Sequence, residues 1–197
     1  QPAKVAIGPA RMGFWHGGGH MWNDADVALI IGNNTLVSHF SIPGGIPSFS
    51  PHSALREGKQ RGMQIICIDP RETEVARRAD LHLQVRPGHD AAVVAAMLHV
   101  ILAEERHDHE FCAQHLSSLD TLRAALERFT PARVAPAAGI DASQIIEAAR
   151  VFATGPRGTA VTGTGPEMGP HPNLLQHLVQ TLWCSRPTGR AAKCPRQ

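Results

Sequence analysis

Short, unbroken apolar runs separated by helix-like stretches constrain the fold of this chain more than any other feature. The first run covers residues 27–31 and ends at Gly32, and the second covers 65–68 and ends at Asp69. Runs of this length without alternating polar positions are typical of strands buried on both faces of a parallel sheet. Alternation predicts a third strand at 81–85, and a fourth is predicted at 159–162.

Helical patterns lie between these strands. Helices are predicted at about 52–61, 72–79, 90–105, 141–152 and 172–183, with further short helices within 108–138. Asp90 is predicted to be the N-cap of its helix, and Asp141 with Gln144 resembles a capping box. One apolar stripe along the third of these helices is predicted, formed by Val93, Val94, Met97, Leu98, Ile101 and Leu102. Loops are predicted at 33–52 and at 163–170, where glycine and proline accumulate.

This alternation predicts an α/β fold with a doubly wound, mostly parallel sheet and helices on both faces. Residues 1–155 are predicted to form a nucleotide-binding domain with a helical extension, and 156–183 the start of a second α/β cofactor-binding unit. Residues 184–197 are expected to be a disordered or artefactual tail, because apolar periodicity stops there. The chain begins at Gln1 without a signal pattern, so we expect an internal fragment and leave its localisation open.

Composition excludes several classes of function. Hydrophobic residues make up 43% and charged residues 18% of the chain, which is sufficient for a sizeable core. The net charge is +2 and basic residues are scattered, so no nucleic acid or anionic membrane partner is expected. No apolar run reaches the roughly 18 residues of a membrane span. The four cysteines form no CxxC pair, which argues against a zinc or iron–sulfur centre held here, and Cys67 is expected to be a buried, inert thiol.

Polar and glycine residues follow each of the first three predicted strands. These segments are 32–34, 69–71 and 86–90. Ligands of parallel α/β sheets bind at the carboxyl ends of the strands, so the three segments are expected to meet on one rim of the sheet. The rim is therefore the predicted binding site.

Each segment offers chemistry that suits a nucleotide. Gly32 allows close backbone approach, and the asparagines after it offer amide donors for phosphate or ribose. Asp69 is placed to accept hydrogen bonds from ribose hydroxyls. The Asp90 carboxylate could accept a bidentate hydrogen bond from the N1–H and N2–H₂ groups at the edge of guanine. Arg71 and Arg86 carry the planar donors that neutralise a diphosphate.

Structural alternatives remain for these and other polar residues. Asp90 has a capping role in any case, and Arg71 is equally able to pair only with Glu74 or Asp80. His16 and His20 are separated by a flexible glycine loop, which is a poor metal scaffold, and the sequence 107–109 is interpreted as a solvated turn. No metal-ligand set and no nucleophilic triad is predicted within the chain.

The strand-end segments resemble the molybdopterin oxidoreductase family, which includes formate dehydrogenases, nitrate reductases and dimethyl-sulfoxide reductases. The resemblance extends over about residues 10–183. It rests on four segments in a fixed order: DADVALIIGNN at 24–34, IICIDPRETE at 65–74, ADLHL at 79–83 and RPGHDAA at 86–92.

The resemblance implies a large catalytic subunit that holds molybdenum or tungsten between two molybdopterin guanine dinucleotides. It implies that the loop 162–168, with Gly163, Thr164 and Gly165, begins the region that meets the second dinucleotide. A 4Fe-4S cluster and the metal ligand would lie before residue 1, and His16 is the best candidate for a polar residue near the active site. The implied partners are the rest of the same subunit and iron–sulfur electron-transfer subunits. The residues implied to contact one dinucleotide are Gly32, Asn33, Asn34, Asp69, Arg71, Gly88 and Asp90.

Two departures and two rival interpretations accompany the resemblance. Thr35 stands where the family often has proline, and no glutamine or histidine pair occurs at 167–168. A nicotinamide-dependent dehydrogenase is one rival, but the glycines of GxGxxG are missing after Gly32. A scaffold subunit that kept the fold and lost the metal is the other. If the resemblance holds, the chain by itself is expected to have no turnover.

Overall fold

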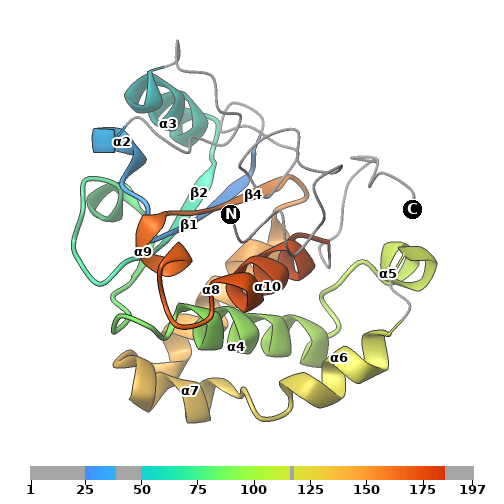
Figure 1. Cartoon of the computed structure of the whole chain (residues 1–197). Coiled ribbons are helices and arrows are strands. Elements are labelled where there is room, and N and C mark those ends of the chain that lie inside the picture. The colour runs from blue at the N-terminus through green and yellow to red at the C-terminus, as the bar shows by residue number, and fades with distance from the viewer. Residues whose placement is uncertain (1–24, 39–49, 116–117, 185–197) are drawn as a thin grey trace.

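The computed structural model describes residues 25–38, 50–115 and 118–184, and its centre is one parallel sheet (Figure 1). The strands are β1 (Val27–Ile31), β2 (Gln64–Ile68), β3 (Leu81–Leu83) and β4 (Gly158–Thr162), in the order β3-β2-β1-β4. Every neighbouring pair is parallel. The predicted α/β class with a doubly wound parallel sheet is therefore confirmed.

The fourth strand lies in the same sheet as the first three. Ala28 of β1 aligns with Ile65 of β2 on one side and with Thr159 of β4 on the other. The strand that follows residue 156 thus pairs with β1, which is hydrogen-bonded on both of its edges. The domain boundaries of a longer protein stay a prediction.

The chain reverses its direction of strand addition next to β1. It passes from β1 to β2 and β3 at one edge, and then through helices α4 to α8 to reach β4 at the other edge. The carboxyl ends of β1 and β4 therefore flank a topological switch point, where parallel sheets leave a crevice.

The helices mostly follow the predicted ranges, with three differences. A short helix, α2, occupies part of the predicted loop 33–52, and α9 occupies part of the loop 163–170. The helix predicted at 72–79 is a single 3₁₀ turn: Oγ1 of Thr73 accepts from the Ala76 N–H at its start, and Ala79 has extended backbone at its end. The bounds are α2 Thr35–Ser38, α3 Pro51–Gln60, η2 Ala76–Arg78, α4 Asp90–Ala103, α5 His109–His115, α6 Leu119–Leu126, α7 Pro131–Ala138, α8 Ala142–Thr154, α9 Thr164–Glu167 and α10 Pro172–Cys184.

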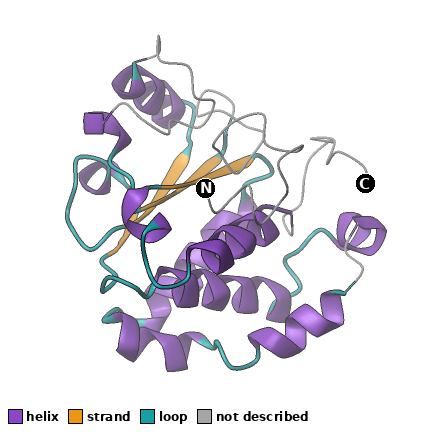
Figure 2. Ribbon diagram, in the orientation of Figure 1, coloured by secondary structure: helices purple, strands orange, loops and turns teal. Residues whose placement is uncertain are grey.

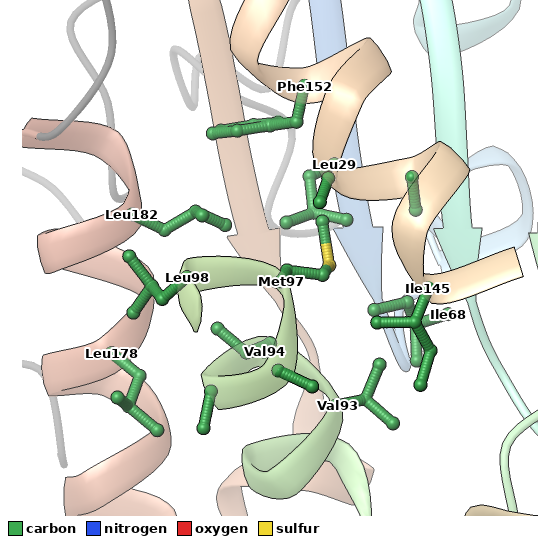
Figure 3. Packing of buried hydrophobic residues seen from close by; sticks show 14 of the residues in the cluster. Leu29, Ile68, Val93, Val94, Met97, Leu98, Ile145, Phe152, Leu178 and Leu182 are labelled. Atoms are coloured by element: carbon green, nitrogen blue, oxygen red, sulfur yellow. The ribbon is translucent and has the colours of Figure 1, made fainter. Parts of the chain in front are cut away.

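Helices cover both faces of the sheet, as predicted (Figure 2). Alternate residues of β1 point to opposite faces: Leu29 joins the core formed with α4, α8 and α10, and Ile30 joins the core formed with α3. Figure 3 shows Met97 of α4 beneath Leu29, between Phe152 and Ile145 of α8. Both faces of the central strands are thus withdrawn from water, which explains why their sequences are uninterrupted apolar runs.

Helix α4 is the central helix of the larger core. It packs against α8, α10, α7 and α6, and its buried residues run almost without a break from Val93 to Leu102. The predicted stripe is buried, and the burial extends beyond it to Ala95, Ala96 and Val100. Neighbours enclose this helix on several sides, so it has little polar face.

The predicted capping residues have different outcomes. The capping box of Asp141 and Gln144 is confirmed at the start of α8. The N-cap of α4 is His89, however, and Asp90 is the first helical residue. Gly88 has a φ of 90°, and the tight turn that it makes brings the chain into the helix one residue earlier than predicted.

Glu104 links the end of α4 to α8 and predicts an acid-sensitive contribution to stability. Its carboxylate accepts hydrogen bonds from Arg150 (2.7 Å) and from Arg106 (2.6 Å). The Arg150 hydrogen bond, with a smaller contribution from Arg106, lowers the pKa of Glu104 from 4.5 to about 2.

A lowered folded-state pKa stabilises the fold above pH 4.5, and this contribution is lost as the pH falls toward 2. We expect Glu104→Gln to cost about 1 kcal/mol at pH 7, since the pair is partly exposed, and almost nothing near pH 2. Urea denaturation at the two pH values measures the difference; an equal cost at both would contradict it.

Cys67 in β2 is predicted to be unreactive in the folded protein. Its side chain is fully buried, and burial, followed by the charge of Asp69, raises the pKa of the thiol to about 12. The thiolate is the reactive form, so iodoacetamide at pH 8 should leave Cys67 unmodified in the native chain and modify it in urea. Peptide mass spectrometry measures this, and native-state labelling of Cys67 would refute the burial.

The described helices include none with the length and apolar character needed to cross a bilayer.

Candidate nucleotide-binding site

A cleft of about 730 Å³ lies at the carboxyl ends of the strands. Its volume is within the range of small-molecule sites. The structure brings together there all ten residues that the sequence predicted for cofactor contact: Gly32, Asn33, Asn34, Asp69, Arg71, Gly88, Asp90, Gly163, Thr164 and Gly165. His16, the remaining candidate, lies outside the described residues, as does the predicted tail from residue 185.

Glycine backbones form the part of the cleft at the switch point. Gly32 has a φ of 55°, and a Cβ atom there would lie 2.3 Å from Cδ of Pro166. A Cβ atom on Gly163 would lie 2.1 Å from the Gly32 carbonyl oxygen. The loops after β1 and β4 are therefore in direct backbone contact, which only glycine permits. Gly165 differs, because no atom lies within 4 Å of the position its Cβ would take.

Asn34 presents an unsatisfied polar atom in the same cleft. Its Nδ2 donates to Oε2 of Glu74 at 2.6 Å, which fixes the orientation of the amide. Its Oδ1 is buried and has no hydrogen-bond partner. A buried acceptor without a partner costs about 1–3 kcal/mol, and a ligand with an N–H or O–H group would remove that cost. The neighbouring Asn33 is buried and its amide lies 3.5 Å from the Thr162 carbonyl.

Asp69 and Arg71 form a pair at the end of β2. Asp69 is 3% exposed and accepts a hydrogen bond from the Arg71 backbone N–H at 2.9 Å. The guanidinium of Arg71 lies 3.9 Å from the same carboxylate and is 78% exposed, so it is available to an anion. The alternative partners are otherwise engaged: Glu74 pairs with Arg77 at 3.0 Å and Asp80 with Lys59 at 2.9 Å.

Asp90 faces the cleft from the first turn of α4. Burial, and secondarily the negative charge of Asp69, raises the pKa of its carboxyl. Both carboxylates line the cleft, in agreement with the expectation that Asp69 and Asp90 lie on one rim of the sheet. Arg86 does not contribute to the cleft as predicted. It packs against Gly139, and its guanidinium lies 3.4 Å from the Ala137 carbonyl, so this side chain secures α7.

A buried polar network at the β4 end was not predicted from the sequence. Thr162 donates to Glu167 Oε1 at 2.9 Å, and Gln176 of α10 donates to both residues. Gln176 is 4% exposed, and Thr162 and Glu167 line the cleft. The signal was a glutamine among the apolar positions of the last helix, but its meaning depends on a contact between elements that sequence periodicity does not contain.

The fold and cleft together define a parallel α/β domain with a candidate ligand site at the switch point. A family model for molybdopterin oxidoreductases matches residues 10–180. The chain therefore belongs to the molybdopterin oxidoreductase family, as the sequence resemblance predicted.

Individual relatives agree with this assignment. Formate dehydrogenase H of Escherichia coli is 32% identical over 171 residues, which is 83% of this chain and 23% of that protein. The F420-dependent formate dehydrogenase 1 subunit alpha of Methanococcus maripaludis is 36% identical over 129 residues, 66% of this chain and 18% of that protein. Among solved structures, acetylene hydratase from Pelobacter acetylenicus matches 93% of this chain and 23% of its own with a TM-score of 0.78 and 26% identity. The chain thus spans about a fifth of the length of these relatives.

Proposed function

We propose that the cleft binds the nucleotide part of a molybdopterin guanine dinucleotide, within the catalytic subunit of a molybdenum or tungsten oxidoreductase. The observation that carries the proposal is the convergence of Asp69, Asp90 and Arg71 on a cleft floored by glycine backbone. The family implies a molybdenum or tungsten pterin cofactor. The guanine form, a bis arrangement of two dinucleotides and a 4Fe-4S cluster elsewhere in the subunit are part of the proposal.

Three features of the described residues fit such a ligand. The open space at Gly165 offers room for a ligand group that a bulky side chain would displace. The unsatisfied Oδ1 of Asn34 offers an acceptor for a ribose hydroxyl or an amine. The exposed guanidinium of Arg71 offers paired donors to a diphosphate.

Each charged residue then has a distinct task. Asp69 accepts from ribose hydroxyls and, through its backbone hydrogen bond, orients the Arg71 loop. Ionised Asp90 accepts hydrogen bonds from the N1–H and N2–H₂ groups of guanine. Adenine lacks this pair of donors. The raised pKa of Asp90 means that nucleotide binding weakens as the pH falls and the carboxyl becomes protonated. When bound, the cofactor supplies the two-electron chemistry at its metal; this part of the protein supplies binding, orientation and electrostatics.

The remaining parts of the proposed subunit would cover the cleft. Val37 lines the cleft and is 62% exposed, and Met168, which follows α9, is 81% exposed. Exposed apolar side chains beside a binding cleft suit contact with another part of the same protein. We propose that this part, together with iron–sulfur electron-transfer subunits, completes the enzyme. The names of its relatives include both formate dehydrogenase and acetylene hydratase.

The alternatives have less support. The loop 32–37 lacks the glycines of a nicotinamide-binding fingerprint, and the family match is to molybdopterin enzymes. A scaffold subunit that binds the nucleotide without metal is distinguished from an enzyme by its metal content.

The test is analysis of the full-length protein purified with its cofactor. We expect molybdenum or tungsten, and release of guanosine monophosphate upon acid hydrolysis, with two nucleotides for each metal. Metal without a guanine nucleotide would reject the guanine assignment. Guanine nucleotide without metal would identify the scaffold alternative.

A further inference from the structure

Two histidines and a glutamate gather at the turn between α4 and α5. This turn follows the C-terminal end of α4, whereas Asp90 at the N-terminal end lines the cleft. The nearest nitrogen and oxygen atoms of Glu105, His107 and His109 all lie within 4.8 Å of one another. Oε2 of Glu105 is 3.8 Å from Nε2 of His107 and 3.7 Å from Nε2 of His109. The sequence interpretation of 107–109 as a solvated turn is wrong for His107, which is 4% exposed.

The imidazole of His107 lacks the hydrogen bonds that a buried ring normally makes. Its Nδ1 is buried without a partner. Its Nε2 faces Glu105 at 3.8 Å, which is too long for a hydrogen bond. Most buried polar side-chain atoms in proteins have a partner. An ion held between the three residues would supply one to Nε2 of His107.

Glu105 has an unusual backbone. It has a φ of 53°, the one positive value of a non-glycine residue in the described parts of the chain. This is the position after a helix end where glycine is preferred, and another residue there is strained. The strained residue is the one whose carboxylate faces both histidines, so a glycine at this position would relieve the backbone and remove the ligand.

We propose that Glu105, His107 and His109 bind a divalent transition-metal ion of the zinc type. A tetrahedral ion with bonds of about 2.0–2.1 Å places its ligand atoms roughly 3.3–3.4 Å apart. The separations of 3.7 and 3.8 Å from Oε2 of Glu105 are close to that arrangement. The ligand atoms of all three residues lie within 4.8 Å of one another, so small side-chain rotations would complete it. Two imidazoles and one carboxylate are a zinc ligand set, with a water molecule as the fourth ligand.

Arg123 of α6 holds the carboxylate in place. Its Nη2 lies 2.8 Å from Oε1 of Glu105, and its Nη1 donates to the Leu102 carbonyl at 2.8 Å. Because the arginine engages Oε1, Oε2 is left facing the two histidines. Such an outer partner fixes the direction of a metal ligand. A bound ion would therefore tie the ends of α4, α5 and α6 together.

The experiment is calorimetric titration of the full chain with Zn²⁺ at pH 7.5, and separately with Mg²⁺. We expect Zn²⁺ to bind at this turn and to raise the melting temperature, whereas Mg²⁺, which prefers oxygen ligands, should not bind there. Because His107 is buried, its replacement risks unfolding. Glu105→Gly and His109→Ala are the informative variants, since glycine suits the backbone at 105 and the side chain of His109 is 64% exposed.

The control variant is His171→Ala, an exposed histidine that precedes α10. Each ligand variant should lose one equivalent of Zn²⁺, or bind that equivalent at least about tenfold more weakly, while the control retains it. The proposal is overturned if Zn²⁺ binding and the thermal shift are the same in Glu105→Gly, His109→Ala and the unmodified chain.

Discussion

Gly163→Ala is expected to prevent this domain from folding stably. The added Cβ would lie 2.1 Å from the Gly32 carbonyl oxygen and 2.9 Å from Cα of Asn33. Both atoms belong to backbone, so a rotamer change cannot relieve the overlap. The loops after β1 and β4 would have to separate, although Gly163 donates its N–H to the Ile31 carbonyl at 2.8 Å. We expect a loss of more than about 4 kcal/mol in the free energy of unfolding.

Gly165→Ala is the matched control for this prediction. It is the same substitution two residues along the same loop, but the new Cβ meets no atom within 4 Å. Gly165 lies in helix α9, where alanine is favoured over glycine by roughly 0.5–1 kcal/mol. Urea denaturation followed by circular dichroism measures both variants. Similar stability of the two would show that the β1 and β4 loops are not in contact as described.

A side chain larger than alanine at position 165 should abolish cofactor binding without unfolding the protein. Gly165→Leu places its side chain into open cleft space rather than into the core. We expect a melting temperature close to that of the unmodified protein, and at least about a hundredfold weaker nucleotide binding, because the ligand and the side chain require the same volume.

The measurement is made on the full-length protein purified with its cofactor. Metal and guanine nucleotide content are determined for Gly165→Leu and for Gly165→Ala, together with the melting temperature of each. Alanine should retain the cofactor and leucine should lose it. Full retention by a folded Gly165→Leu protein would place the ligand elsewhere.

The sheet was predictable because its signals are local. Residues 27–31 and 65–68 are apolar at every position, which is sufficient to identify buried parallel strands. Strand-end loops of parallel strands share an edge for geometric reasons, so the meeting of Asp69 and Asp90 followed from chain order alone. The capping box at Asp141 required only four consecutive residues.

The features that were missed depend on contacts between distant segments. Arg86 was assigned to the cleft because it follows a strand, but the backbone of α7 takes its guanidinium. The strand at 159–162 was predicted, but its pairing with β1 rather than with the other edge of the sheet depends on distant contacts. Gln176 and the burial of His107 depend on how helices pack, and no local pattern contains that information.

The most direct test of the central claim is whether this cleft selects guanine through Asp90. Titration of the full chain with guanosine diphosphate and with adenosine diphosphate at pH 7.5 measures the preference, and Asp90→Asn provides the comparison. We expect the guanine nucleotide to bind more tightly, and we expect Asp90→Asn to lose that preference, at a cost of about 1.5–3 kcal/mol for a hydrogen-bonded charge. Equal affinities for the two nucleotides, or a guanine preference that survives Asp90→Asn, would contradict the account.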